Sequence, residues 1–412
     1  MLAHTCRQAV APRPSRSVTC AFNPAAASRR GHASASASGP HIAPLDRNVL
    51  ELSGPDAQKF LKGLSCRDVE STGGGYSGFM NASGRVLHTT FIHPNGPQRY
   101  LISHQSSPDH PAPLPALLAP FRLRSKVRIK DVTAEWAAWS AWGEDVGEPS
   151  PRRIWKLGSG GAAESHWEWE SPRPAGAGPE EVACWDLRAG FGARGMGRQI
   201  LIPRGKEPAL LSTHDLATAG DYDLHRMRLG VPEGPAEIVP TSALPLESCM
   251  DIHGGVDFRK GCFLGQELTV RTYHTGMTRK RILPIRLFPL NAVETPLREF
   301  LTPSSTTPPV GLSKPEPVDL VYHPPASSAS QKTRSAGRIL SLHPAVTSVG
   351  LALVRLEMAE RCWWSGDIAS GTVGEWLSSG VGRLTAAIGG AEWGVYVDKG
   401  EAYAAALEQV DA

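Results

Sequence analysis

The spacing of apolar residues along the chain predicts several short helices. In Ser53–Leu64 the apolar residues recur every three to four positions, and Pro55 suits the first turn of a helix. Asp221–Leu229 predicts a second short helix, closed by Gly230, the residue type that most often follows a helix. A third helix is expected to begin near Gln266.

Alternation of apolar and polar residues predicts strands between these helices. Tyr76–His93 predicts two strands around a turn at Asn81–Gly84, and Cys184–Leu201 predicts strand, turn and strand. The sharpest alternation is Phe121–Lys130, which predicts a strand with Arg and Lys along one face. That face is either an anion-contacting surface or a solvated edge that its charges protect from pairing.

Changes in composition divide the chain. Residues 147–180 are rich in Gly, Pro, Ser and Glu and predict a loop insertion, and residues 291–335 predict a Pro- and Ser-rich linker or long loop. Between that linker and the tail, Gly337–Leu356 alternates as a β-structure does. The tail from Cys362 is rich in Gly and Trp, and its pattern predicts no particular structure.

The N-terminal segment has the composition of a targeting sequence. The first acidic residue is Asp46, and five arginines but no lysine precede it, among many Ser and Ala. We therefore expect residues 1–40 to be a mitochondrial transit peptide, with a disordered tail as the alternative. The whole chain has 43 basic and 40 acidic residues, so without those five arginines 38 basic residues face 40 acidic ones. This balance argues against a nucleic-acid partner.

The remaining composition excludes further classes of protein. The fractions of 41% hydrophobic and 20% charged residues are ordinary for a globular chain, and no apolar run has the length of a membrane span. The cysteines beyond the N-terminal segment are scattered, with no CxxC and no zinc-type Cys/His spacing. A disulfide framework and a self-contained iron–sulfur site are therefore not expected. These cysteines are Cys66, Cys184, Cys249, Cys262 and Cys362.

Cys262 differs from the other cysteines in its surroundings. It lies between Gly261 and Gly265, follows two cations, Arg259 and Lys260, and precedes the expected helix. Glycines let the backbone turn sharply and approach a ligand closely. Cations and a helix N-terminus favour the thiolate over the thiol. The pattern predicts a thiol with a chemical role.

The motif around this cysteine resembles a known family. Lys260–Glu267, KGCFLGQE, matches the signature K-G-C-Y/F-x-G-Q-E of a folate-binding family. That family contains the bacterial YgfZ-like proteins and mitochondrial iron–sulfur cluster assembly factors, and both resemble the T-protein aminomethyltransferase of the glycine cleavage system. Further segments agree in the same order, among them His225–Pro235, Leu244–Phe258 and Thr275–Pro284. The likeness covers roughly Leu45–Leu356.

The resemblance implies an α+β fold. Residues 41–285 would form an aminomethyltransferase-like folate-binding domain of two intertwined ferredoxin-like units, interrupted by the insertion at 147–180. Residues 286–412 would carry a six-stranded β-barrel, the second insertion at 291–335 and a divergent tail. The family arranges these parts as a ring around a central channel.

The resemblance also implies a function. It points to a factor of the mitochondrial matrix that assembles or inserts [4Fe–4S] clusters into client enzymes of the aconitase-like and radical-SAM kinds. Its partners would be A-type iron–sulfur carriers and those clients. Tetrahydrofolate is the implied cofactor, together with a transient iron–sulfur cluster, and Cys262 would be the reactive thiol or a metal ligand shared with a partner.

Other site residues follow from the same resemblance. Arg226 would pair with the carboxylate tail of a folate, and Glu247 would accept the paired N–H groups of its pterin. Lys260 and Gln266 would complete the binding set. The alternatives are a surface arginine, a helix-cap acid and an ordinary helix start. As a nucleophile Cys262 would need a base, for which His274 is a weak candidate.

Two departures from the family pattern bear on the choice between functions. Thr89 stands where the aminomethyltransferases have a catalytic Asp, and a hydroxyl cannot supply that carboxylate. Cys249 stands where the family usually has Asn, which removes an amide from the implied folate pocket and predicts, as a second possibility, two cysteines, Cys249 and Cys262, near one site. A folate-dependent one-carbon or aminomethyl transferase remains the alternative, and a non-catalytic folate sensor or scaffold is a third. Whether the chain is an enzyme stays open at this stage.

Overall fold

The computed structural model describes residues 39–69, 74–144, 151–168, 178–193, 195–301, 318–325, 327–328, 332–346, 348–362 and 371–411. The predicted transit peptide lies almost entirely outside these residues. Among the helices that are described, none has both the length and the apolar character needed to cross a membrane.

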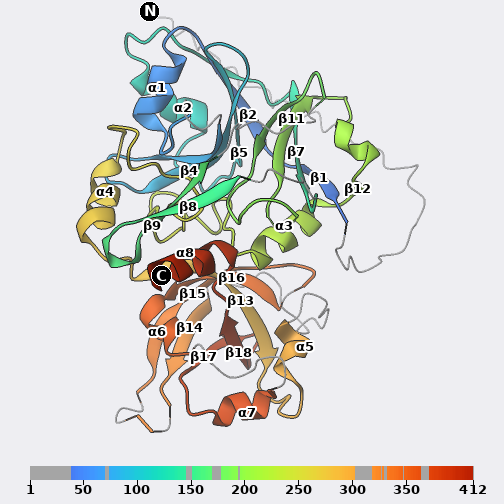
Figure 1. The fold of residues 1–412 in the computed structure, drawn as a ribbon, viewed down its shortest axis with the longest axis vertical. Coiled ribbons are helices and arrows are strands. Elements are labelled where there is room, and N and C mark those ends of the chain that lie inside the picture. The colour runs from blue at the N-terminus through green and yellow to red at the C-terminus, as the bar shows by residue number, and fades with distance from the viewer. Residues whose placement is uncertain are drawn as a thin grey trace, which may run out of the picture. The chain divides into compact units, whose positions relative to one another are not determined.

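Two five-stranded sheets form the N-terminal part of the fold (Figure 1). The first sheet is entirely antiparallel, and the second contains one parallel pair. The first has the order β3 (Gly75–Met80), β4 (Val86–Pro94), β5 (Arg99–His104), β2 (Asn48–Ser53), β6 (Arg128–Asp131). The second has the order β10 (Val182–Trp185), β11 (Arg198–Pro203), β7 (Trp136–Trp142), β1 (His41–Leu45), β12 (Asp215–Leu216).

The local predictions for this part are largely confirmed. Helix α1 (Ala57–Leu64) buries all four apolar residues of its predicted face, Ala57, Phe60, Leu61 and Leu64. They pack with residues of α2 (Leu114–Leu118) and of the first sheet in one apolar cluster. The predicted turn at Asn81–Gly84 joins β3 to β4, and β10 pairs with β11 as the strand–turn–strand pattern predicts.

The prediction of a strand over Phe121–Lys130 is wrong for most of its length. A short helical turn (Ala119–Phe121) ends at Phe121, and β6 begins only at Arg128. Between them the chain forms a turn in which Leu123 has a φ of 41° and an exposed side chain. The alternation of charge and apolar residues in this segment comes from a solvated loop, because a strand needs a neighbour to pair with and only Arg128–Asp131 has one, in β2.

The expected loop insertion at 147–180 contains regular structure. Strands β8 (Arg152–Leu157) and β9 (Ala163–Glu168) pair as an antiparallel hairpin. Ala163, Glu164 and Ser165 on β9 are buried. This hairpin is therefore part of the packed fold.

The C-terminal part is the expected closed barrel of six antiparallel strands. It begins at Lys280, before the expected boundary at residue 286, and its last two strands come from the tail for which the sequence predicted no structure. The strands follow one another as β13 (Lys280–Pro289), β16 (Val349–Arg355), β15 (Arg334–Leu342), β14 (Val318–His323), β17 (Arg383–Ile388), β18 (Ala391–Val397). Strand β14 lies within the segment 291–335 that composition marked as a linker.

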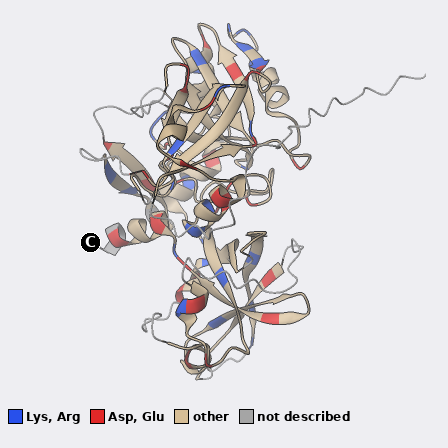
Figure 2. Ribbon diagram, turned by 90° about the vertical axis from the view of Figure 1, so that its right-hand side faces the viewer, with Lys and Arg blue, Asp and Glu red and all other residues tan. Residues whose placement is uncertain are grey.

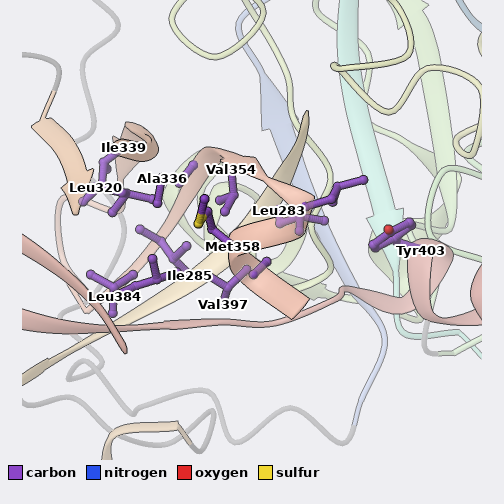
Figure 3. Close-up of a cluster of buried hydrophobic side chains, with 14 of the residues drawn as sticks. Leu283, Ile285, Leu320, Ala336, Ile339, Val354, Met358, Leu384, Val397 and Tyr403 are labelled. Carbon is purple, nitrogen blue, oxygen red and sulfur yellow. The ribbon is translucent and has the colours of Figure 1, made fainter. Parts of the chain in front are cut away.

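Apolar side chains from all six strands fill the barrel (Figure 3). Met358 of helix α6 (Leu356–Glu360) joins them, and Tyr403 of α8 (Glu401–Asp411) packs beside Leu283 at the end of the cluster. The other helices are α3 (Ala219–Arg228), α4 (Gln266–Thr275), α5 (Leu297–Leu301) and α7 (Val373–Ser378). Both signs of charge are interspersed over the sheets and the barrel (Figure 2).

One buried ion pair connects the barrel with the segments before it. The guanidinium of Arg281, on β13, donates two hydrogen bonds of 2.8 Å to the two carboxylate oxygens of Asp251. It also donates to the carbonyls of Leu246 and Gly161, each at 2.9 Å. Neither charged side chain of the pair is exposed. Four segments therefore meet at one cation, since the same guanidinium lies 5.4 Å over the ring of Tyr403.

We expect Arg281→Met to lower the free energy of unfolding by about 3–5 kcal/mol. The variant keeps the apolar stem but leaves the buried Asp251 carboxylate without its counter-charge. Denaturant titration of the purified protein measures the change. The control is Arg338→Met, which removes an ion pair with Asp319 that is more than half exposed, and should cost less than about 1 kcal/mol. Equal losses in the two variants would contradict the role given to Arg281.

Candidate functional site

Cys262 lies on an exposed loop whose backbone is left-handed at two glycines. Gly261 and Gly265 have φ values of 90° and 79°, in the left-handed region. A Cβ on Gly265 would lie 2.2 Å from the carbonyl oxygen of Asn81, so no larger residue fits there. Cys262 is exposed between these glycines, while Phe263 is buried below it. The loop therefore has a fixed shape that turns the thiol outward.

Lys260 anchors this loop from beneath. Its Nζ donates hydrogen bonds of 2.6 Å to the carbonyls of Lys62 and Ser65 at the C-terminal end of α1, and lies 4.7 Å over the ring of Phe263. A cation at a helix C-terminus satisfies carbonyls that lack helical partners. Burial lowers the pKa of Lys260 to about 8, although nearby acidic groups oppose the change. Lys260 thus holds the loop rather than facing a ligand.

Gln266 completes the loop at the start of α4. Its side-chain oxygen accepts a hydrogen bond of 3.2 Å from the backbone N–H of Phe263. Cys262, Gln266 and Glu267 line a groove of about 410 Å³ that is open to solvent. Its opposite wall consists of Gly63 and Leu64 of α1, with Ala82 and Phe121. The structure therefore brings Cys262 and Gln266 together, with Lys260 as the support beneath them.

Arg226 lies elsewhere, in a network of its own. It is buried on α3 and donates hydrogen bonds of 2.7 Å to Asp223 and to Glu237. Burial lowers the pKa of the guanidinium, but these two carboxylates outweigh burial and raise the pKa above its ordinary value. Glu237 in turn accepts a bond of 2.8 Å from Ser341 of the barrel. Arg226 thus already has two carboxylate partners.

Glu247 differs from Arg226, because its carboxylate is not engaged by another side chain of the described residues. Its side chain is half-buried, and in the described part of the chain no donor reaches its carboxylate. Its backbone carbonyl accepts a hydrogen bond of 2.8 Å from Ile282 of β13, which fixes its position beside the barrel. Thr89, for which the resemblance predicted the position of the transferase Asp, is half-buried on β4 opposite Gly78.

Cys249 does not form a pair of reactive thiols with Cys262. It is buried in the barrel cluster, and its Sγ donates to the carbonyl of Ile282 at 3.2 Å. Burial raises the pKa of its thiol to about 11. Its φ of 60° lies in the left-handed region, which Asn adopts more readily than Cys. The backbone at this place therefore suits an Asn better than the Cys that stands here.

The other cysteines are also unlike Cys262. Burial raises the pKa of Cys66 and of Cys362 to about 12, and raises that of Cys184 as well. Among the cysteines of the described residues, only Cys262 is exposed. His274, the weak candidate for a base, lies in the last turn of α4, about 12 Å along the helix from Gln266. Nor does any group of three or more His, Cys, Asp and Glu in the described ranges have the arrangement of a metal site.

The sequence did not indicate two buried, unpartnered oxygens beside the turn at Gly254 and Gly255. Tyr76 Oη and Ser165 Oγ are buried there without hydrogen-bond partners, and a Cβ on Gly255 would lie 2.7 Å from the Tyr76 ring. Next to Ser165, burial raises the pKa of Glu164 to about 7. Ser165 and Glu164 escaped notice because the composition of 147–180 predicts a loop.

The polar groups described above fit a folate-type ligand only in part. Such a ligand needs an acceptor for its pterin N–H groups, and Glu247 is available for that purpose. The unpartnered oxygens of Tyr76 and Ser165 are further polar contacts inside the domain. The predicted cations do not fit an anionic tail in the same way, because Arg226 and Lys260 already have partners within the chain.

The chain is similar to proteins of known name. No family model matches it. A protein of Cryptococcus neoformans var. neoformans serotype D, named "Iron-sulfur cluster assembly factor IBA57 homolog, mitochondrial", is 66% identical over 377 residues, which cover 90% of this chain and 99% of that protein. A protein of the same name from Neosartorya fischeri is 35% identical, covering 76% of this chain and 69% of the relative.

A solved structure is similar in fold. It is the glycine cleavage system aminomethyltransferase T of Bartonella henselae, with a TM-score of 0.53 and 11% identity, and the match covers 89% of this chain and 86% of that one. At this identity the likeness concerns the fold alone, and it confirms the expected aminomethyltransferase-like architecture. With the identity of 66% over nearly the whole of the Cryptococcus relative, the chain belongs to the family of mitochondrial iron–sulfur cluster assembly factors named IBA57.

Proposed function

We propose that this protein works in the mitochondrial matrix in the assembly of [4Fe–4S] clusters on client enzymes, with Cys262 as its ligating thiol. The observation that carries the proposal is the placement of Cys262. It is the one exposed cysteine among the described residues, and it lies on a glycine-framed loop that Lys260 holds against α1. A fixed, accessible thiol suits a ligand that a second protein has to reach.

The proposal requires a partner, because one thiolate does not hold an iron–sulfur cluster. Such clusters usually take four cysteine ligands. No other thiol lines the groove around Cys262, and the described residues contain no metal-binding group of three or more side chains. The missing ligands therefore belong to the partner, for which we propose A-type iron–sulfur carriers. Aconitase-like and radical-SAM enzymes are the proposed clients.

A role as a nucleophilic or transferase residue has less support. The described part of the groove contains no histidine, and His274 lies at the far end of α4. Thr89 supplies no carboxylate at the transferase position. The geometry therefore favours cluster assembly over one-carbon transfer.

Cys262 should react before the other cysteines of the folded protein. A brief pulse of iodoacetamide at pH 8, followed by mass spectrometry of the peptides, should label Cys262 at least about tenfold faster than Cys66, Cys184, Cys249 or Cys362, because those thiols are shielded and stay protonated. Unfolding the protein first should remove the difference. Equal labelling in the folded protein would contradict the exposed placement of Cys262.

Cys262→Ser should abolish client maturation without unfolding the protein. In matrix extracts that lack the native protein, we expect wild-type chain to restore aconitase activity and Cys262→Ser to restore less than about a tenth of it, since an exposed Ser is neutral for folding but a poor iron ligand. Cys362→Ser, which changes a half-buried cysteine outside the groove, is the matched control and should behave as wild type. Full activity of folded Cys262→Ser would contradict the ligand role.

We extend the proposal to a tetrahydrofolate-type ligand, which would bring a reduced pterin to the domain. Glu247 would accept its N–H groups, and Tyr76 and Ser165 offer unpartnered oxygens in the interior. The fold supports this part of the proposal because the similar solved structure is an aminomethyltransferase. Arg226 is left out, as its guanidinium is already paired.

Glu247→Gln should weaken binding of tetrahydrofolate about tenfold or more, because the amide has one acceptor oxygen where the carboxylate has two, and its NH2 group would face the second N–H of the pterin. Anaerobic calorimetric titration of the full chain measures the affinity. Glu267→Gln, on an exposed residue of the Cys262 groove, is the control and should leave folate binding unchanged. Unchanged affinity in Glu247→Gln would remove the pterin contact from the proposal.

A further inference from the structure

A loop with an unusual surface adjoins the Cys262 groove. Leu123 is 88% exposed and Phe121 is 41% exposed, and the cations Arg122, Arg124 and Lys126 alternate with them and are exposed too. We call residues 121–126 the cationic loop. Large apolar side chains in water are common singly, but here they stand between three cations at the edge of a hollow.

The cationic loop has a fixed shape. The backbone N–H of Lys126 donates a hydrogen bond of 2.6 Å to the carboxylate of Asp56, the residue before α1. Gly54 packs against it, since a Cβ there would lie 2.2 Å from the carbonyl oxygen of Lys126. The next residue, Val127, is buried in the cluster with α1. Leu123 is thus held in solvent, and it is held with a left-handed backbone that costs a leucine energy.

The hollow beside this loop continues into the groove at Cys262. The loop and α1 line a space of about 730 Å³, in which Phe121, Leu123 and Arg124 face Lys59 and Phe60. Gly63, Leu64 and Phe121 line both this space and the Cys262 groove. We call the two together the α1 groove. It leads from the exposed leucine to the exposed thiol.

Positive charge dominates the end of the groove away from Cys262. In the described part of the chain, none of the side chains of Lys59, Arg122, Arg124 and Lys126 pairs with a carboxylate. Asp56 is the acid that lines this end, and its carboxylate already accepts the N–H of Lys126. Near the thiol the groove also contains Glu267. An occupant of the cationic end therefore needs acidic side chains around an apolar one.

We propose that the α1 groove is the surface on which the iron–sulfur carrier docks, through an acidic segment with an apolar side chain that packs against Phe121 and Leu123. This inference rests on the proposed function, because that function requires a second protein at Cys262. The apolar side chains favour a protein over a nucleic acid, whose phosphates would leave Leu123 without a partner. Docking along α1 would deliver the carrier's cysteines to the thiol at the other end.

The test is binding of a purified A-type iron–sulfur carrier, in its apo form, to the full chain in low salt. We expect the triple variant Arg122→Gln/Arg124→Gln/Lys126→Gln to bind about tenfold more weakly and to lose most of the salt dependence seen in the wild type. Leu123→Asn should also weaken binding, while its unfolding midpoint stays equal to that of the wild type or rises, because Asn tolerates the left-handed backbone.

The matched control is Lys332→Gln/Arg334→Gln/Arg355→Gln, which removes the same charge from exposed positions of the barrel and should leave affinity unchanged. If both triple variants weaken binding equally, only net charge matters and the proposal is overturned. The proposal is also overturned if the cationic-loop variants bind the carrier as well as the wild type does. A third contradicting result is a wild-type protein that does not bind the carrier but binds a single-stranded RNA or an anionic vesicle, with that binding lost in the cationic-loop variants.

Cys262→Ser separates this inference from the proposed function. Because Ser is close to Cys in size and the proposed charge contacts lie at the cationic end of the groove, Cys262→Ser should weaken binding of the apo carrier less than the triple cationic-loop variant does. Weak docking of the cationic-loop variants, together with full client maturation by Cys262→Ser, would retain the docking surface and reject the ligand role. Normal docking of those variants, together with failed maturation by Cys262→Ser, would do the reverse.

Discussion

The buried ion pair between Arg281 and Asp251 is the constraint on which the arrangement of the parts depends. A guanidinium has five donors in one plane, and here the two terminal nitrogens reach a carboxylate and two carbonyls from two separate segments, while Nε has no partner among the described residues. Two charges taken out of water are tolerated when they pair with each other and further hydrogen bonds support the pair, as the two carbonyls do here. The consequence is a fixed start for β13 and a fixed turn around Asp251, from which the chain runs directly into the Cys262 loop.

The site repeats this design on a smaller scale. Lys260 is buried beneath the loop that exposes Cys262, and its ammonium group donates hydrogen bonds to the carbonyls at the end of α1. The same helix forms one wall of the groove, so the position of the thiol and the shape of its surroundings are set by one contact. A single exposed thiol on a rigid support makes chemical sense when the remaining ligands arrive with another protein. The aminomethyltransferase-like fold is thus combined with an exposed cysteine, for which we propose a role that needs no carboxylate at Thr89.

The sequence was most informative where structure is local. The face of α1, the hairpin turn at Asn81 and the glycines around Cys262 all follow from neighbouring residues, and they were predicted. The structure of Phe121–Lys130 was predicted wrongly, because charged and apolar residues alternate in this solvated loop as they do in a strand. The hairpin of β8 and β9 was not predicted, because the Gly and Pro residues of the surrounding segment indicated a loop.

Contacts between distant residues were beyond the sequence altogether. The sequence of α3 allows the pair of Arg226 with Asp223, three residues before it, but gives no sign that Glu237, outside the helix, also occupies the guanidinium. Likewise the sequence predicted that Lys260 contacts a ligand, whereas in the structure its ammonium group donates to carbonyls at the end of α1. The family resemblance supplied the barrel, but its last two strands lie in a tail that the resemblance did not reach. In each case the missing information is the identity of a partner far away in the chain.

The most direct test of the account is the iron content and the visible absorption of the protein mixed anaerobically with a cluster-loaded carrier and then separated from free carrier. The account predicts a complex that retains iron and a cluster spectrum with the wild-type chain, and that loses both with Cys262→Ser. A complex whose iron and spectrum do not depend on Cys262 would contradict the claim that this thiol completes a shared site.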